Sequence, residues 1–396
     1  MLTSSIATMS MVFSGLPAVS LLIKEQLQLT SSQLSLLMTS FFAGTMVMSL
    51  VYTFYFDRFK VRMLLLIGLG ITGTFMVVSG AYLHFVWMTV LIALAGLGYG
   101  IISPSTNKGI VDWFPQQIRG TAMSLKQVGV MAGSMISSLI LPAIALVWGL
   151  RGSLLFLGVF AWLIGIISFI LYKDREPAVD SVRRLGMRDV LRLFKNPQIL
   201  RLNAVSMLFT GIQFIYLMFL PLFLGEVFRY DLIFVGFMLS LASVGGGAGR
   251  VAWGMVSDFL FKGRRKPVLI VIACLSLLSG AVLAVIPAWT AAPVMGVIVT
   301  VYGMTAAGYN GLMHTMTVEL TDSHLSGVLS GINFAFINFG SIVFPYMIGI
   351  LLDASGNYRI AWIISAAMAL AAAGLMLTIG TEKRASLQTR APQKPA

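Results

Sequence analysis

Apolar residues follow one another along this chain in long runs, which short polar segments interrupt. A helix needs about 20 mostly apolar residues to cross the hydrocarbon layer of a membrane, and the runs have about that length. We therefore expect an all-α membrane protein with twelve transmembrane helices. The expected spans are 3–23, 33–56, 63–83, 87–113, 121–146, 150–172, 200–225, 233–257, 267–287, 290–316, 325–351 and 358–379.

The longest internal polar segment divides these spans into two sets of six. We expect an N-terminal bundle at 1–172, a linker at 173–198, a C-terminal bundle at 199–380 and a polar tail at 381–396. Within the linker, residues 187–194 could form an amphipathic helix on the membrane surface. A solvated linker explains the same composition.

Charged markers of the first half recur in the second half after about 200 residues. Parallel six-helix repeats about an axis normal to the membrane describe one transporter architecture, with the substrate near the midplane between the halves. The sequence therefore predicts two pseudo-symmetric bundles. The corresponding residues are Asp57 and Asp258, Asp112 and Glu319, and Arg151 and Arg359.

The distribution of charge sets the expected orientation. The chain is 58% hydrophobic and 10% charged, whereas soluble proteins carry about 25% charged residues. Of 27 Lys and Arg, 20 lie in the loops or at the span ends of one side, 4 lie at those of the other, and 3 lie deep within spans. By the positive-inside rule the basic side, with both termini, is cytoplasmic. This asymmetry explains the net charge of +13 without a nucleic-acid partner.

The loop after the eighth span carries a motif of a known family. Gly254-x-x-x-Asp258 is followed by Lys262, Arg264, Arg265 and Lys266, and a weaker copy, Asp57-Arg58, follows the second span. These loops resemble those of the major facilitator superfamily, which implies alternating access in a bacterial plasma (inner) membrane. We expect gating residues here, because a carboxylate can pair with cytoplasmic arginines that part when that face opens. The expected gating residues are Asp57, Arg58, Arg119 and Asp258.

Two further features are similar to narrower groups of that family. The stretch from Asn107 to Gly129, with Asp112-Trp113-Phe114-Pro115 in it, resembles bacterial organic-anion permeases. Arg250, four residues before Gly254, is similar to an arginine with which monocarboxylate and oxalate carriers hold a carboxylate. The resemblance implies that Arg250 binds an anionic substrate.

Three cations lie well inside expected spans, away from the span ends, whereas none of the 14 carboxylates lies deep in one. An ionised side chain at that depth is costly unless it is paired or hydrated. We therefore expect Lys108, Lys126 and Arg250 to line a cavity and attract an anion, with Arg250 as a bidentate donor. Alternatives are a helical pair of Lys108 with Asp112, snorkelling of Lys126, and a bond from Arg250 to Asp258 or to a carbonyl.

Uncharged and titratable side chains within other spans complete the expected substrate site. Polar side chains of this kind also join membrane helices to one another, which is the alternative role. His314 occupies the position in the second half that Asn107 occupies in the first. The remaining candidates are Asn107, Gln213, Tyr216, Tyr309, Asn310, His314 and Asn338.

The sequence predicts a secondary transporter that works as a monomer in the lipid bilayer. Its expected substrate is a small organic anion, a monocarboxylate or sugar acid, with protons as the candidate coupling ion and His314 among their carriers. One cysteine and three histidines indicate no metal cluster, cofactor or catalytic set. Two alternatives stay open: efflux of amphipathic compounds, suggested by 24 Met and 26 Phe, and a non-transporting membrane receptor.

Overall fold

The computed structural model describes residues 1–55, 59–115, 118–175, 196–319 and 326–380, and these form helices and no strand. The expected helix at 187–194, the tail, Asp57 and Arg58 lie outside this part of the chain. The helices of the first half are α1 (Leu2–Ala18), α2 (Ser20–Leu27), α3 (Ser31–Tyr55), α4 (Val61–Ala81), α5 (Phe85–Trp113) and α6 (Arg119–Leu171). Those of the second half are α8 (Pro197–Leu222), η3 (Phe223–Val227), α9 (Leu232–Met255), η4 (Val256–Leu260), α10 (Arg265–Val285), α11 (Ala292–Ala306), α12 (Asn310–Glu319), α13 (Ser326–Ser355) and α14 (Arg359–Thr378).

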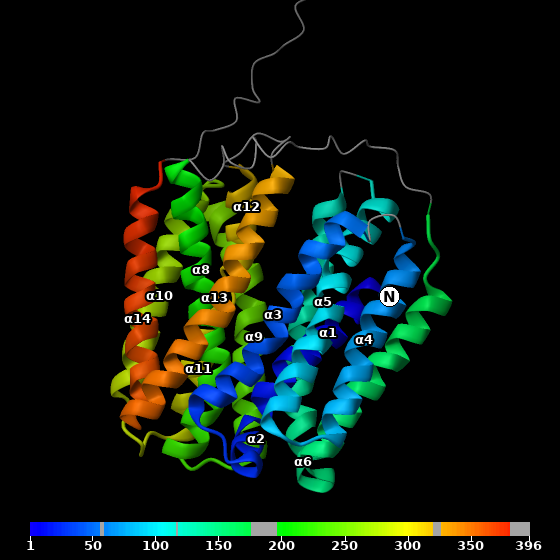
Figure 1. Ribbon diagram of the computed structural model, residues 1–396. Helices are drawn as coiled ribbons and strands as arrows, with labels where there is room; N and C mark the ends of the chain where they lie inside the picture. The colour runs from blue at the N-terminus through cyan, green and yellow to red at the C-terminus, as the bar shows by residue number, and fades with distance from the viewer. Residues whose placement is uncertain (56–58, 116–117, 176–195, 320–325, 381–396) are drawn as a thin grey trace, which may run out of the picture.

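These elements make twelve membrane-crossing segments in the described part of the chain. Nine helical stretches are long and apolar enough to cross a membrane, and α1 with α2, bent by 55°, forms a tenth. Helix α6 contains two crossings joined at Gly149, whose φ of 67° reverses the chain direction. Helix α3 lies along α5 and completes the set (Figure 1). The expectation of twelve spans is confirmed.

The segments form two bundles that stand side by side in Figure 1. In the first, α1 and α4 pack on α6, and α3 and α4 pack on α5. In the second, α11 packs on α9, α13 and α14 pack on α8, and α10 packs on α14. The bundles meet mainly where α13 contacts α3 and where α9 contacts α6. Each of these contacts therefore pairs the second span of one half with the fifth span of the other.

Glycine allows α3 and α5 to approach closely. A Cβ atom on Gly96 would lie 1.9 Å from the carbonyl oxygen of Phe41. The Thr45 hydroxyl uses the same approach, since it donates to the Gly96 carbonyl at 3.1 Å. Small residues allow membrane helices to pack backbone to backbone in this way.

We expect Gly96→Ala to lower the stability of the purified protein by about 1–3 kcal/mol, because the added methyl group has no room and the two backbones must separate. Thermal unfolding in detergent measures the effect. Gly374→Ala is the matched control, since nothing lies within 4 Å of a Cβ atom there. Equal melting temperatures for the two variants would contradict this account of the α3–α5 contact.

Ionic contacts join the bundles at the end that carries α2. The Lys24 ammonium on α2 lies 2.6 Å from the Glu226 carboxylate and donates to the Tyr358 hydroxyl at 2.7 Å. Burial raises the pKa of the Tyr358 phenol, so the hydroxyl is neutral and can accept this bond. One cation of the first bundle thus holds two groups of the second.

Asp353 makes a second contact at the same end. Thr30 and Gln33 form a capping box at the start of α3. The Gln33 backbone N–H donates to the Thr30 hydroxyl at 3.2 Å, and the Thr30 backbone N–H donates to the Gln33 side-chain oxygen at 3.1 Å. The capping box does not satisfy the backbone N–H groups of Ser31 and Ser32. These donate to the Asp353 carboxylate at 2.6 and 2.9 Å. A carboxylate of the second bundle therefore completes the cap of a helix in the first.

The tenth span differs from the expected continuous helix. It is divided into α11, which ends at Ala306, and α12, which begins at Asn310. A turn at 307–309 separates them. The break frees backbone carbonyl groups inside the membrane, where each unsatisfied group is costly, so side chains must satisfy them.

Candidate functional site

Helix α9 packs against the break in the tenth span and supplies those side chains. A Cβ atom on Gly249 would lie 2.3 Å from the Met304 carbonyl oxygen, so glycine lets α9 approach α11. The Trp253 indole then donates to the Met304 carbonyl at 2.8 Å. The Arg250 Nε donates to the Ala307 carbonyl at 3.2 Å. This packing fixes the stem of the Arg250 guanidinium.

The outer edge of the guanidinium faces the first bundle. Its Nη1 donates to the Gln127 side-chain oxygen on α6 at 3.2 Å. The Tyr99 and Tyr309 phenols lie near the guanidinium. Arg250 thus bonds to a carbonyl, the alternative role weighed from the sequence, and at the same time bridges the two bundles.

Lys126 lies one residue before Gln127 and is almost fully buried. Its ammonium donates to the side-chain oxygen of Asn107 on α5. Lys126 also lines a cavity of about 620 Å³ in the first bundle, which Trp113 and Tyr172 border from the ends of α5 and α6. The lysine is therefore held by a neutral amide beside open space.

The second bundle contributes amide, phenol and imidazole groups. The Asn310 amide donates to the Gln213 side-chain oxygen at 3.2 Å and to the Ala307 carbonyl at 3.1 Å. The Tyr309 ring stacks on Phe209, and its hydroxyl lies 2.8 Å from that of Thr210. These bonds fix the start of α12 next to Arg250.

His314 lies one helical turn after Asn310 on the same side of α12. Arg250 donates to the same Ala307 carbonyl as Asn310, and Lys126 is the neighbour of Gln127, which accepts from Arg250, so both cations lie near the imidazole. The three groups come from α12, α9 and α6 and form a cluster of two cationic side chains and one imidazole. Such a cluster can hold a small anion by charge-assisted hydrogen bonds.

The cluster is open to solvent. The side chains of Asn107, Gln127 and His314 are exposed although they face the junction of the bundles. Asn107 lies six residues before the end of α5, about 9 Å at helical rise. Since the contacts of Lys24 and Asp353 join the bundles at the α2 end, we infer that solvent reaches the cluster from the opposite end, where α5 ends and α6 begins.

Three expected substrate residues lie elsewhere. The Tyr216 hydroxyl donates to the Val299 carbonyl, and its ring packs on Tyr302 inside the second bundle. Asn338 is buried and donates to the Phe334 carbonyl of its own helix. The Lys108 ammonium donates to the Phe59 carbonyl at 3.3 Å. The structure does not bring these three side chains to the cluster around Arg250.

The expected gating residues that the structure describes make contacts within their own bundles. Asp258 pairs with Arg265, so the pairing of this carboxylate with a basic-loop arginine is present. Arg119 donates to the carbonyls of Phe114 and Val111 and ties the turn between α5 and α6.

Sequence reasoning did not select Gln127 or Asp353. Gln127 is part of the stretch that resembles organic-anion permeases, and its position next to Lys126 was the available signal. Asp353 has the sequence appearance of an ordinary loop carboxylate, and only the capping box at Thr30, with two amides left over, indicates a need for an acceptor.

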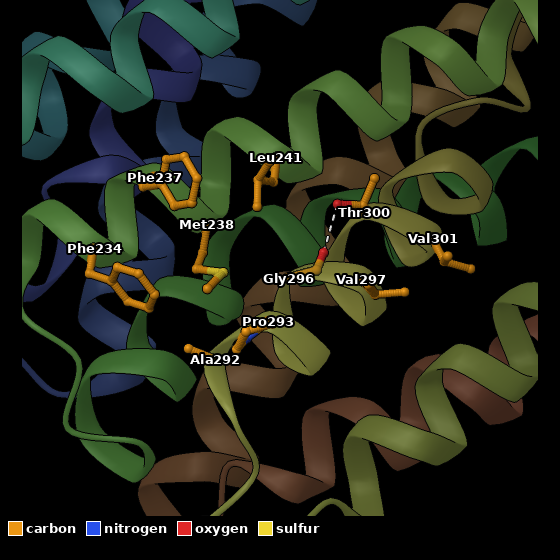
Figure 2. A pocket seen from close by; sticks show the side chains of 10 residues that line it. All are labelled: Phe234, Phe237, Met238, Leu241, Ala292, Pro293, Gly296, Val297, Thr300 and Val301. Carbon is orange, nitrogen blue, oxygen red and sulfur yellow. Dashed lines mark hydrogen bonds between the residues drawn. The ribbon is translucent and has the colours of Figure 1, made fainter.

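A second cavity, an apolar groove in the second bundle, is not suited to bind an anion. It has a volume of about 530 Å³ and lies between α9 and α11 (Figure 2). Its rim includes Phe237, Val297 and Val301, all of them exposed, as is usual for side chains facing lipid. The hydroxyl of Thr300 is satisfied by the Gly296 carbonyl at 2.7 Å, as the dashed line in Figure 2 shows. The groove lining carries no charged side chain.

Comparisons with known proteins agree with this architecture. The chain is 26% identical over 385 residues to a probable L-galactonate transporter of Escherichia coli (strain K12), covering 91% of this chain and 83% of that protein. It is 23% identical over 363 residues to the hexuronate transporter of Bacillus subtilis (strain 168), covering 88% and 86%. A crystal structure of the nucleoside transporter NupG superimposes with a TM-score of 0.79 at 14% identity, covering 96% of this chain and 98% of that one. The model of the Major Facilitator Superfamily matches residues 1–345 and 263–396, and the chain belongs to that family.

Proposed function

We propose that the protein is a proton-coupled transporter of a small organic anion of the sugar-acid type, working by alternating access. One observation carries the proposal: Arg250 and Lys126 lie within spans at the junction of the bundles, and no described carboxylate contacts either of them. Two such cations are costly in a membrane. A bound anion offsets that cost.

The arrangement suits a carboxylate with hydroxyl groups. The outer edge of the Arg250 guanidinium would take the carboxylate in a bidentate pair, replacing its bond to the neutral amide of Gln127. The amide nitrogens of Asn107 and Gln213 have no described acceptor, and the side-chain oxygen of Asn310 has no described donor, so these amides can bond to sugar hydroxyls. The galactonate and hexuronate named for the two relatives are compounds of this class.

Alternating access requires one end to be closed while the other is open. The contacts made by Lys24 and Asp353 close the α2 end, and the exposed Asn107 and His314 give access at the other. If the charge asymmetry sets the orientation, the open end is the cytoplasmic one. We propose that anion binding at Arg250 and Lys126 draws the bundles together at this end while the α2 end separates.

The first test is a thermal-shift screen of the purified protein with L-galactonate, D-glucuronate, inorganic anions and lipophilic cations. A ligand present at 100 times its dissociation constant stabilises a folded protein by about 2.7 kcal/mol. We expect sugar acids to raise the melting temperature and the other classes to leave it unchanged. Stabilisation by lipophilic cations alone would instead indicate efflux of amphipathic compounds.

Counterflow in proteoliposomes separates a transporter from a sensor. Vesicles loaded with unlabelled sugar acid should take up labelled sugar acid, because a transporter exchanges ligand across the membrane. A protein that binds the sugar acid in the screen without any counterflow would be a membrane receptor.

A further inference from the structure

His314 is in a situation unlike that of the other polar groups of the cluster. Its imidazole is exposed, and no described residue makes a hydrogen bond with it. Asn107, Gln127 and Asn310, by contrast, are all hydrogen-bonded within the cluster. An imidazole that is reached by solvent and has no hydrogen-bond partner among the described residues can exchange a proton with water.

The charges that face His314 are positive. Arg250, on α9, shares the Ala307 carbonyl with Asn310, which lies one turn before His314, and Lys126, on α6, is the neighbour of Gln127, to which Arg250 donates. Helix α10 also packs on α12, but Arg265 is held by Asp258 and Lys266 by the Leu377 and Ile379 carbonyls. Helix α13 packs there too, and its carboxylate, Asp353, caps α3 at the α2 end. Among the described side chains, no carboxylate interacts with the imidazole.

Two neighbouring cations oppose a third positive charge at His314. An anion bound between Arg250 and Lys126 neutralises most of the electrostatic repulsion that these cations exert on a protonated imidazole. The imidazole can then take up a proton from water, and the loaded site holds both. When the anion leaves, the repulsion returns and the proton is released.

We propose that His314 carries the transported proton, and that an anion at Arg250 and Lys126 is what allows it to bind. This assignment rests on the proposed anion transport. Because coupling between two ligands is reciprocal, the proton must strengthen anion binding as much as the anion strengthens proton binding.

Proton uptake by the wild-type protein is the first test. Purified protein in weak buffer with a pH-indicator dye is mixed with L-galactonate or D-glucuronate. We expect proton uptake on binding, and an affinity for the anion that rises about tenfold or more between about pH 8 and about pH 5.5, where histidine titrates. Binding without proton uptake and without this pH dependence would overturn the proposal.

His314→Gln assigns the effect to this residue. In proteoliposomes we expect the ratio of pH-gradient-driven accumulation to counterflow to fall at least about tenfold, because glutamine cannot carry the proton. His84→Gln, at the start of α5, is the matched control and should keep the wild-type ratio. A wild-type ratio in His314→Gln would assign the proton to another group. Equal loss of accumulation and counterflow in a folded variant would make His314 a binding residue only.

The same experiments distinguish the assignment of His314 from the proposal of sugar-acid transport on which it rests. If the protein does not transport sugar acids, wild type and His84→Gln show no counterflow at all. If it transports them without His314 as carrier, counterflow is normal and only the variant-specific change is missing.

Discussion

Replacing Arg250 by Gln should reduce uptake of the transported anion about thirtyfold or more while the protein still folds. Truncating one partner of a buried, charge-assisted contact typically costs about 2–5 kcal/mol, and 1.4 kcal/mol is a factor of ten. Glutamine keeps an amide donor for the Ala307 carbonyl, to which Arg250 Nε now donates. It loses both the charge and the paired donors that a carboxylate needs. Concentration-dependent uptake in proteoliposomes measures the loss.

Arg250→Lys tests whether geometry matters in addition to charge. Lysine retains a cation but lacks the planar fork of the guanidinium, so we expect activity between that of Arg250→Gln and wild type. Arg151→Gln is the matched control, since Arg151 is exposed beside the turn at Gly149. Full uptake by Arg250→Gln would remove Arg250 from the site. A lowered melting temperature with unchanged uptake per folded molecule would give Arg250 a structural role only, through its hydrogen bond to the Ala307 carbonyl.

Replacing Asp353 by Ala should open the α2 end. The carboxylate accepts hydrogen bonds from the amides of Ser31 and Ser32, and each bond to a charged group contributes roughly 1.5–3 kcal/mol. Because Asp353 is exposed, water can hydrogen-bond to the two freed amides in the variant and offset part of that free energy. We expect the population open at the α2 end to rise about thirtyfold.

Cysteine labelling measures this opening. Ser35 is buried at the contact of α3 with Gly349 of α13. In a Cys274→Ser background, which removes the exposed native cysteine, Ser35→Cys should react with a membrane-impermeant maleimide faster when Asp353→Ala is added. Asp231→Ala is the matched control, because Asp231 caps α9 of its own bundle through the Phe234 amide at 2.9 Å. An unchanged labelling rate in Asp353→Ala would show that this carboxylate does not hold the end closed.

Much of this architecture follows from the sequence, because the membrane imposes long apolar runs and the basic loops set their direction. The proposal of Arg250 and Lys126 as site residues followed from the same reasoning, since a cation in a span needs an explanation. Periodicity could not show which side of a nearly all-apolar helix faces a cavity. For that reason Tyr216, which packs inside the second bundle, was expected in the site and Gln127 was not.

The break at 307–309 was missed for a related reason. The run from 290 to 316 is apolar enough to cross as one helix, and nothing local forces it to stop. The stop is stabilised from outside, by Trp253 and Arg250 donating to the Met304 and Ala307 carbonyls. Interactions between residues some 50 positions apart do not appear in a local pattern.

The break in the tenth span and Arg250, which donates to it, should vary together among homologous sequences. A homologue whose tenth span is an unbroken helix has no carbonyl at 307 for position 250 to satisfy, so a cation there would lose half of its present bonding. A homologue that loses the arginine leaves that carbonyl with only the Asn310 amide of its two present side-chain donors. We therefore expect substitutions at 250 and in the turn at 307–309 to occur together among relatives, and grafting Arg250 alone onto another scaffold to yield an unstable protein.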